Sequence, residues 1–348
     1  MNTLHWFPRE EFFARVDRVQ TALRNRGIAA LLAFQPETVT YLTGFFTRAY
    51  GSFQFAIVPA AGEPVIVCRD MESYYLDSTC VFMGRELWSD DDDTMAVAAR
   101  AIERVVGSRA AVGAELGSWQ LSAQRYLRIR DALPHLAWSD CSDLVTRMRF
   151  VKSATELTYQ KRAAKAAEAG MEAAVSTAAP GTTERDLAAR ICAAMVRAGS
   201  DLPGPGVLSS GERAFHLHGS YSDRMIQEGD NVQIETTPNV RHYHARFMRP
   251  IKAGRASDED HEIVGRLIDI QDRALSEVGP GVPASVPDGV YRSGVLSAGL
   301  AEHYTNKTFY SIGLLLHPSG GEPLEAALGS AWSFEPGMTF HTYVLARG

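Results

Sequence analysis

The sequence predicts two domains of different classes, an α/β domain over residues 1–150 and an α+β domain over residues 151–348. A length of 348 residues is long for one domain and suits two. The first part alternates short apolar segments with amphipathic stretches, which is typical of an α/β unit. After a boundary near residues 142–155, long helices alternate with strand hairpins. This pattern indicates α+β rather than a Rossmann sheet, and no glycine-rich phosphate loop is present.

In the first domain, residues 8–27 are predicted to form a helix, because apolar side chains recur at helical spacing from Phe12 to Leu23. Pro8 suits the first turn of this helix, and Gly27 suits its end. The remaining expected elements are strands at 29–34, 55–58, 64–68 and 110–116, and helices at 95–106 and 121–133.

The acidic run over residues 90–93 resembles a metal site, but it directly precedes the predicted helix 95–106. Carboxylates are favoured at the positive end of a helix. We therefore interpret the run as a helix cap.

The second domain opens with an alanine-rich helix predicted over residues 155–179 and closed by Pro180 and Gly181. Thr183 with Asp186, and Ser257 with Asp260, have the spacing of helix caps. The second of these caps begins a helix that ends near residue 278.

Composition excludes several classes of partner. A net charge of −6 and a pI near 6.0 give no reason to expect nucleic acid or an anionic membrane. We expect no signal sequence, and the sequence has no run of about 18 apolar residues. The four cysteines lack C-x-x-C spacing and lie mostly among apolar neighbours. We expect free thiols in a cytoplasmic protein that acts on a small molecule.

The segment 229–250 has the pattern of a metal-binding hairpin without its ligands. Turn residues precede a strand that ends at Glu235, and a second turn precedes a strand that reaches Arg249. Two carboxylates in such a hairpin could bridge a pair of metal ions. The second position, eleven residues after Glu235, holds Arg246, which only donates hydrogen bonds and cannot ligate a metal.

Six of the ten histidines lie near candidate motifs of the second domain, and two pairs of them have the spacing of residues on one face of a strand. Such pairs can bind metal, but a hydrogen-bonded inward histidine is an equally good reading of each. The six are His216, His218, His242, His244, His317 and His341.

Four motifs follow one another along the second domain: SGERAFHLH (210–218), the hairpin 229–250, FYSIGLLLHP (309–318) and EPGMTFHTY (335–343). Together they resemble the pita-bread superfamily of methionine aminopeptidase, prolidase, creatinase and ectoine hydrolase. The resemblance covers nearly the whole chain, and the first domain, with YLTGF at 41–45, looks like a creatinase-type N-terminal domain. It implies a pita-bread catalytic domain preceded by this smaller α/β domain.

The peptidases of that superfamily hold two metal ions with five side chains. Carried over by position, these correspond here to Glu235, Arg246, Tyr310 and Tyr343, and the fifth lies in a final strand that the sequence is expected to lack. A divalent ion with one protein ligand is not held against water. The resemblance therefore implies the metal-free branch, close to creatinase and ectoine hydrolase, with no metal or other cofactor.

His218 and His317 match histidines that act around the substrate in the superfamily. In the metal-free branch the first is the acid/base, and a glutamate at the position of Glu235 is nucleophile or substrate anchor. We therefore predict His218, Glu235 and His317 as catalytic residues. The side chains that we expect to bind substrate are Tyr243, His244, Arg246, Arg249, Tyr310, His341, Tyr343 and Arg48.

The chemistry of these residues favours a metal-independent hydrolase of a C–N bond in a small zwitterionic, amidine or guanidino-type metabolite. Such a reaction needs a nucleophile, a proton donor and charge stabilisation, for which Glu235, His218 and Arg246 qualify. Two alternatives stay open: an Xaa-Pro dipeptidase-like metallopeptidase with a rearranged histidine site, and a non-catalytic peptide-binding module. In the latter, Glu235 and Arg246 would form an ordinary buried ion pair.

Creatinase-type relatives are homodimers in which the N-terminal domain of one copy covers the site of the other. The resemblance thus implies a homodimer, with the loop 45–50 and its Arg48 as candidate lid. A plain surface loop is the alternative reading.

Overall fold

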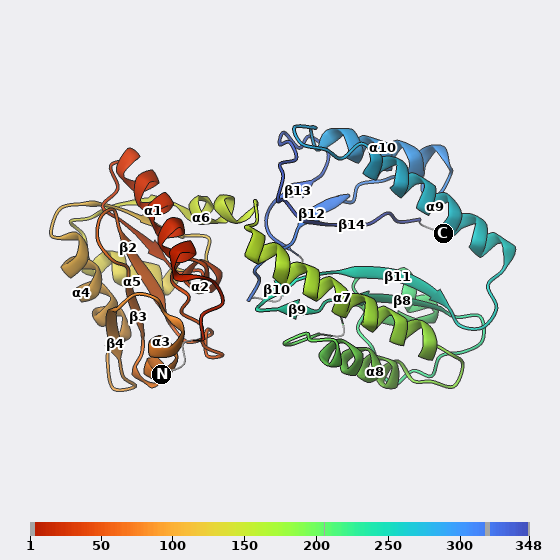
Figure 1. Ribbon diagram of the computed structural model, residues 1–348, viewed down its shortest axis with the longest axis horizontal. Helices are drawn as coiled ribbons and strands as arrows, with labels where there is room; N and C mark the ends of the chain where they lie inside the picture. The colour runs from red at the N-terminus through yellow and green to blue at the C-terminus, as the bar shows by residue number, and fades with distance from the viewer. Residues whose placement is uncertain (1–3, 205, 317–320, 347–348) are drawn as a thin grey trace. The chain divides into compact units, whose positions relative to one another are not determined.

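The computed structural model describes residues 4–204, 206–316 and 321–346. The chain divides into two compact units, Met1–Met148 and Arg149–Gly348 (Figure 1). Each unit is described by itself below.

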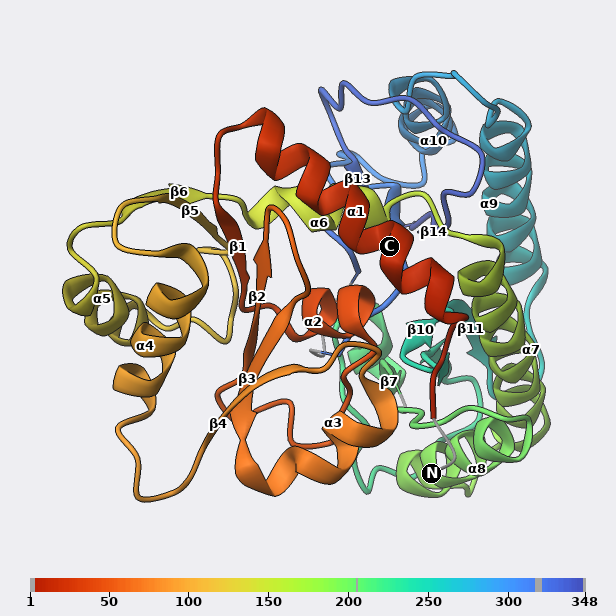
Figure 2. The same ribbon diagram turned by 60° about the vertical axis from the view of Figure 1, so that its left-hand side comes forward.

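Unit 1 is an α/β layer structure whose six-stranded sheet has the order β4-β3-β2-β1-β5-β6. Strand β2 runs antiparallel to both β1 and β3, whereas the outer pairs β3–β4, β1–β5 and β5–β6 are parallel. Helices cover both faces of the sheet, with α1 to α3 on one face and α4 and α5 on the other (Figure 2). In chain order, the elements are α1 (Arg9–Asn25), β1 (Ala30–Ala33), α2 (Pro36–Thr43), β2 (Phe55–Pro59), β3 (Val65–Arg69), α3 (Ser73–Thr79), β4 (Gly84–Trp88), α4 (Thr94–Val106), β5 (Ala111–Ala114), α5 (Ala123–Ala132), β6 (Ala137–Asp140) and α6 (Ser142–Arg149).

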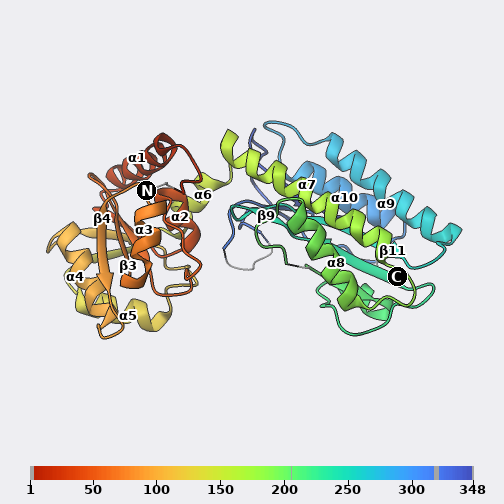
Figure 3. The same ribbon diagram turned by 60° about the horizontal axis from the view of Figure 1, so that its bottom comes forward.

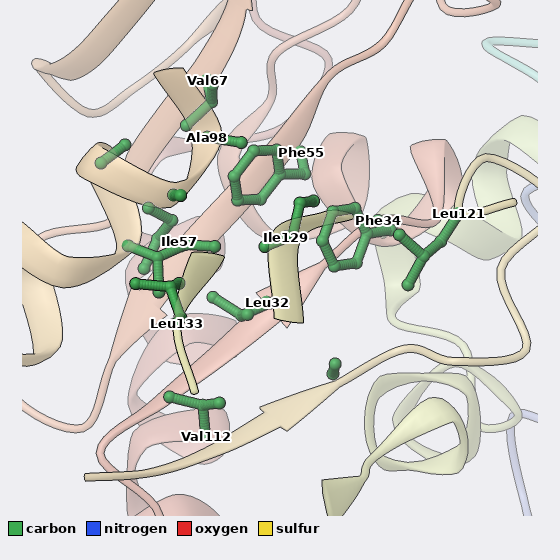
Figure 4. Close-up of a cluster of buried hydrophobic side chains, with 14 of the residues drawn as sticks. Leu32, Phe34, Phe55, Ile57, Val67, Ala98, Val112, Leu121, Ile129 and Leu133 are labelled. Atoms are coloured by element: carbon green, nitrogen blue, oxygen red, sulfur yellow. The ribbon is translucent and has the colours of Figure 1, made fainter. Parts of the chain in front are cut away.

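The core of unit 1 lies between the sheet and helices α4 and α5. Leu32 and Phe55 of the sheet pack there with Ala98 of α4 and Ile129 of α5 (Figure 4). These side chains are fully or almost fully buried, so apolar residues of the predicted strands and helices form the core.

The acidic run before α4 caps the helix, as predicted. The Asp93 carboxylate accepts hydrogen bonds from the backbone N–H groups of Met95 and Ala96. Asp92 accepts from Ser89, and Asp90 pairs with Arg69. Hydrogen bonds and one ion pair within unit 1 thus engage three of the four carboxylates of the run.

Helix α2 was not predicted, although the chain folds into it over eight residues. All eight are buried although four of them are polar, so polar and apolar positions do not separate into an exposed and a buried face and give no helical period. Pro36 at its first position and Gly44 in the left-handed conformation at its end mark it only in retrospect.

Unit 2 is α+β, with helices packed on two small sheets of order β11-β8-β7 and β13-β12-β14 and a separate hairpin β9–β10. Helix α8 lies beside α7, and α10 beside α9 (Figure 3). In chain order, the elements are α7 (Ala154–Thr177), α8 (Glu184–Arg197), β7 (Leu208–Ser210), the 3-10 helix η2 (Gly211–Phe215), β8 (Asn231–Thr236), β9 (Asn239–Val240), β10 (Tyr243–His244), β11 (Phe247–Lys252), α9 (Asp258–Ser276), α10 (Ser285–Ser297), β12 (Phe309–Ser311), β13 (Glu325–Ala326) and β14 (Phe340–Thr342).

The predicted caps of this unit are confirmed. The Ser257 hydroxyl accepts from the N–H of Asp260, whose carboxylate accepts in return from the N–H of Ser257. Thr183 accepts from the N–H of Asp186. None of the described helices is both long and apolar enough to cross a membrane.

The hairpin β9–β10 turns through two residues in the left-handed region. Arg241 has φ 52° and His242 has φ 61°, and the flanking residues Val240 and Tyr243 pair across the turn. Two such residues make a type I′ turn, for which asparagine and glycine are the favoured residues. The strain is held by contacts: the His242 carbonyl accepts from the N–H of Leu315.

Replacing Arg241 by asparagine should therefore stabilise the protein. We expect the free energy of unfolding to rise by about 0.5–1 kcal/mol, because asparagine tolerates a positive φ better than arginine. Urea unfolding measures the change. Arg255→Asn is the control, since Arg255 is exposed and does not have a positive φ; equal effects of the two changes would contradict the strain argument.

Candidate active site

Glu235 and Arg246, which the resemblance aligns with a carboxylate pair, meet at one end of the antiparallel pair β8–β11. Glu235 lies on β8 opposite Met248, and Arg246 immediately precedes β11. Nη1 of Arg246 donates to Oε1 of Glu235 at 2.9 Å. The Arg246 and Glu235 side chains are 11% and 7% exposed, so this is a largely buried ion pair.

An aromatic layer from the other sheet adjoins the ion pair. Tyr310 on β12 pairs in register with His341 on β14, and their ring centroids lie 5.1 Å apart. The Tyr343 ring stacks on His341 at 5.5 Å. The guanidinium carbon of Arg246 lies 5.7 Å from the centre of the Tyr310 ring. Five predicted site residues thus come together, from two sheets.

The two tyrosines of this layer remain protonated. Burial raises the pKa of the Tyr310 hydroxyl, and the charge of Glu235 and a hydrogen bond with its side chain raise it further, although Arg246 lowers it. Burial raises the pKa of Tyr343 to about 12. Both residues therefore present neutral hydroxyl groups beside the carboxylate.

Two histidines of the site are neutral at physiological pH. Burial, followed by the charge of Arg246, lowers the pKa of His341 to about 3. Burial and the charges of Arg246 and His242 lower that of His244 to about 4. Nε2 of His341 is buried and has no hydrogen-bond partner among the described residues. His341 thus offers an acceptor and not a cation.

The other predicted binding residues make contacts of their own or are exposed. The Tyr243 hydroxyl donates to Oε1 of Glu156 at 2.9 Å, which ties the hairpin β9–β10 to the first turn of α7. Arg249 is exposed over the Phe247 ring, and Arg48 is an exposed loop residue of unit 1. His317 lies outside the described residues.

His218 lies on an exposed loop near the ion pair but not in contact with it. The N–H of Leu208 donates to the carbonyl of the next residue, Gly219, and Leu208 pairs with Ile234 on β8. The backbone of Gly219, next to His218, is therefore two strand spacings, about 10 Å, from the backbone of Ile234, next to Glu235. Within the described part of the chain, no hydrogen bond or ion pair joins the two side chains.

A buried carboxylate that sequence reasoning missed anchors this loop at both ends. Glu184 accepts hydrogen bonds from the N–H and hydroxyl groups of Ser210 and of Ser222, at 2.7 Å each. Arg213 pairs with it at 3.0 Å. Burial alone would raise the pKa of Glu184, but these hydrogen bonds together lower it. The only sequence signal near Glu184 was the predicted cap at Thr183, which begins the same helix.

A second missed group is a buried charge cluster next to Tyr310. Glu322 pairs with Lys152 at 2.6 Å and with Arg149 at 3.1 Å, and it accepts from the Ser311 hydroxyl at 2.8 Å. Gly313 lies so close that a Cβ atom there would be 2.6 Å from the Glu322 carboxylate. The cluster holds the segment after Tyr310 in place. Lys152 and Glu322 are 170 residues apart in sequence, so no local pattern could join them.

The residues at this site do not fit a pair of metal ions. Glu235 is engaged by Arg246, and an arginine side chain only donates hydrogen bonds and cannot ligate a metal. Across residues 4–204, 206–316 and 321–346, no three histidine, cysteine, aspartate or glutamate side chains gather as a metal site would require.

The neutral histidines make stability depend on pH. Their folded pKa values lie below the unfolded value of about 6.5, so the unfolded state binds more protons between these limits. The stability that these neutral histidines allow is therefore fully present above about pH 6.5. It is lost progressively as the pH falls toward the folded pKa values of about 4 for His244 and about 3 for His341. For His341 alone we expect a loss of about 2–3 kcal/mol between pH 7 and 4.5. Urea unfolding across this range of pH measures it.

His341→Phe should flatten that pH dependence, because phenylalanine keeps the aromatic stack and does not titrate. His303→Phe, at an exposed position, is the matched control and should leave the slope unchanged. A slope that is the same in both variants would show that His341 is not buried as a neutral group.

Two family profiles match the chain. That of the creatinase/prolidase N-terminal domain matches residues 15–151, and that of metallopeptidase family M24 matches residues 159–344. The prediction of a pita-bread fold is thereby confirmed.

Curated relatives match along nearly the whole chain. The chain is 29% identical to the probable dipeptidase PepE of Mycobacterium tuberculosis (strain ATCC 25618 / H37Rv), over 96% of this chain and 89% of the relative. It is 27% identical to the uncharacterized hydrolase/peptidase y4tM of Sinorhizobium fredii, over 98% and 90%. It is 26% identical to the ectoine hydrolase of Halomonas elongata, over 96% and 89%.

Solved structures show the same fold. Dipeptidase PepE from Mycobacterium ulcerans superposes with a TM-score of 0.81 at 27% identity, over 96% of this chain and 88% of that one. The prolidase from Thermococcus sibiricus superposes with a TM-score of 0.84 at 22% identity, over 96% and 90%. The profile of the catalytic domain spans more than half of the chain, and this protein belongs to metallopeptidase family M24.

Proposed function

We propose that this member of the M24 hydrolases cleaves a C–N bond without a metal ion, in a small zwitterionic, amidine or guanidino-type substrate. The observation that carries the proposal is the ion pair of Glu235 with Arg246 at the place of a metal-bridging carboxylate pair. The likeness to an ectoine hydrolase as well as to dipeptidases supports a C–N hydrolase.

The residues of the site supply the groups that such a reaction needs. Arg246 holds the Glu235 carboxylate in place with a hydrogen bond at 2.9 Å, so that it can act as nucleophile or substrate anchor. The protonated hydroxyl groups of Tyr310 and Tyr343 can donate hydrogen bonds where charge develops on the substrate. These donors take the part that metal ions play in polarising a substrate.

His218 is the proposed acid/base, and His317 the proposed second histidine. The exposed position of His218 near β8 suits a residue that reaches the substrate from one side, while Glu184 fixes both ends of its loop. A histidine transfers protons well near neutral pH. Its contact with the leaving nitrogen forms only when substrate is bound.

The names of the PepE relatives favour a second candidate, a dipeptidase that needs metal. The ion pair argues against it, because Arg246 repels a cation from Glu235.

We also propose a homodimer in which the loop 45–50, with the exposed Arg48, covers the site of the second copy. Analytical ultracentrifugation tests the assembly: a monomer with full turnover would contradict it.

We further propose a cytoplasmic location. The free thiols, three of them buried, suit a reducing setting.

Metal-depleted protein should hydrolyse at least one of creatine, ectoine, related cyclic amidines and Xaa-Pro dipeptides, as measured by mass spectrometry of the products. Added chelator should leave the rate unchanged. Activity that appears only on adding Mn²⁺, Co²⁺ or Zn²⁺ would instead establish the dipeptidase candidate.

Replacing His218 by alanine should lower kcat by about 10²–10⁴-fold, which is the usual contribution of a general acid/base. His216→Ala, two residues away on the same exposed loop, is the matched control and should retain activity. Unchanged turnover in the His218 variant would remove it from the mechanism.

A further inference from the structure

The contacts of Arg246 resemble those of a bound ligand. Its guanidinium is held by a carboxylate on one side and lies over an aromatic ring on the other. A carboxylate with an aromatic face is the combination that recognises planar cations in proteins, through a charge-assisted hydrogen bond and a cation–π contact. The side chain is almost fully enclosed, as a well-bound ligand would be.

We propose that Glu235, Tyr310 and His341 form a receptor for a guanidinium or amidinium group, and that Arg246 occupies this receptor as an internal ligand in the free protein.

The receptor has the charge and shape for such a group once Arg246 is set aside. Glu235 supplies one negative charge, whereas Tyr310, His341 and Tyr343 are uncharged. The rings of the three aromatic residues follow one another at 5.1 and 5.5 Å, with the Tyr310 ring tilted by 48° from that of His341, and they form one aromatic side of the receptor. Nε2 of His341, buried and without a partner in the described part of the chain, is an acceptor for a further N–H.

A substrate cation must therefore compete with Arg246. A simple cation would displace the arginine and leave its largely buried charge without its carboxylate partner, which is unfavourable. A zwitterion avoids this penalty, because its cation can take Glu235 while its carboxylate takes Arg246. The ion pair thus selects molecules that carry both charges. This inference rests on the proposed function for its site and adds how that site discriminates among substrates.

The test removes the internal ligand and supplies a free one. Arg246→Ala should bind methylguanidinium saturably at millimolar concentration, well below the molar range in which guanidinium denatures proteins. Binding is followed by isothermal titration calorimetry and by the rise in Tm that a ligand of the folded state produces. Acetamidinium should bind similarly, whereas tetramethylammonium, which has no N–H donor, should not.

One further variant and the wild-type protein locate the binding. Adding Glu235→Gln to Arg246→Ala should weaken methylguanidinium about 10- to 100-fold, because a charge-assisted hydrogen bond is lost. The wild-type protein should bind methylguanidinium at least about 10-fold more weakly than Arg246→Ala, and 4-guanidinobutyrate more tightly than methylguanidinium.

The proposal is overturned if folded Arg246→Ala binds no methylguanidinium, or if Glu235→Gln leaves the binding unchanged. Should Arg246→Ala be unfolded in buffer, recovery of its circular dichroism on adding methylguanidinium becomes the readout. Failure of that recovery, together with no binding to the Arg246→Gln variant, also overturns it. Hydrolysis of a substrate without methylguanidinium binding would refute this inference alone, and binding without any turnover would refute the proposed function alone.

Discussion

The ion pair between Glu235 and Arg246 is the interaction on which the rest of the site depends. Arg246 contributes to each neighbouring group: it pairs with the carboxylate, lies over the Tyr310 ring, and disfavours protonation of His341 and His244. Because one guanidinium does all of this, the aromatic layer of one sheet and the hairpin of the other form a single electrostatic unit.

A buried ion pair of this kind adds little net stability to a fold. Removing two charges from water costs several kcal/mol per ion, and a well-packed apolar pair is often as stable. The neighbouring histidines also stay neutral at the expense of stability in acid. Unit 2 nevertheless contains further buried charges, in the Glu322 cluster and at Glu184. All three groups lie at the segments that carry predicted site residues, which is where strain and buried polarity are expected to concentrate.

The chain has the fold of its family, and we propose that the side-chain chemistry at its centre is different. The two profiles and the superpositions follow the packing of helices on sheets, which depends on apolar positions across the whole chain. The chemistry depends on a handful of side chains that can change while the packing persists. Phenol, imidazole and guanidinium groups at these places bind and transfer protons, but they do not form the oxygen-rich set that hard divalent cations prefer.

The sequence by itself determined the elements whose periodicity is strong and the identity of the residues at the site. Helices α1, α4 and α7, the Ser257 cap and the Asp93 cap follow from local patterns, because their hydrogen bonds join residues a few positions apart. The five residues of the cluster were also named from motifs. Helix α2, buried on every side, carried no periodic signal.

Only the tertiary structure decided what surrounds those residues. It brought Arg246 over Tyr310, placed the Tyr243 hydroxyl on Glu156, and left His218 on an exposed loop. It also revealed Glu322 with Lys152, whose contact spans 170 residues. Burial, and the pKa shifts that follow from it, depend on atoms that are distant in sequence and adjacent only after folding. For that reason the residue types at the site could be predicted from the sequence, whereas their protonation states and contact partners could not.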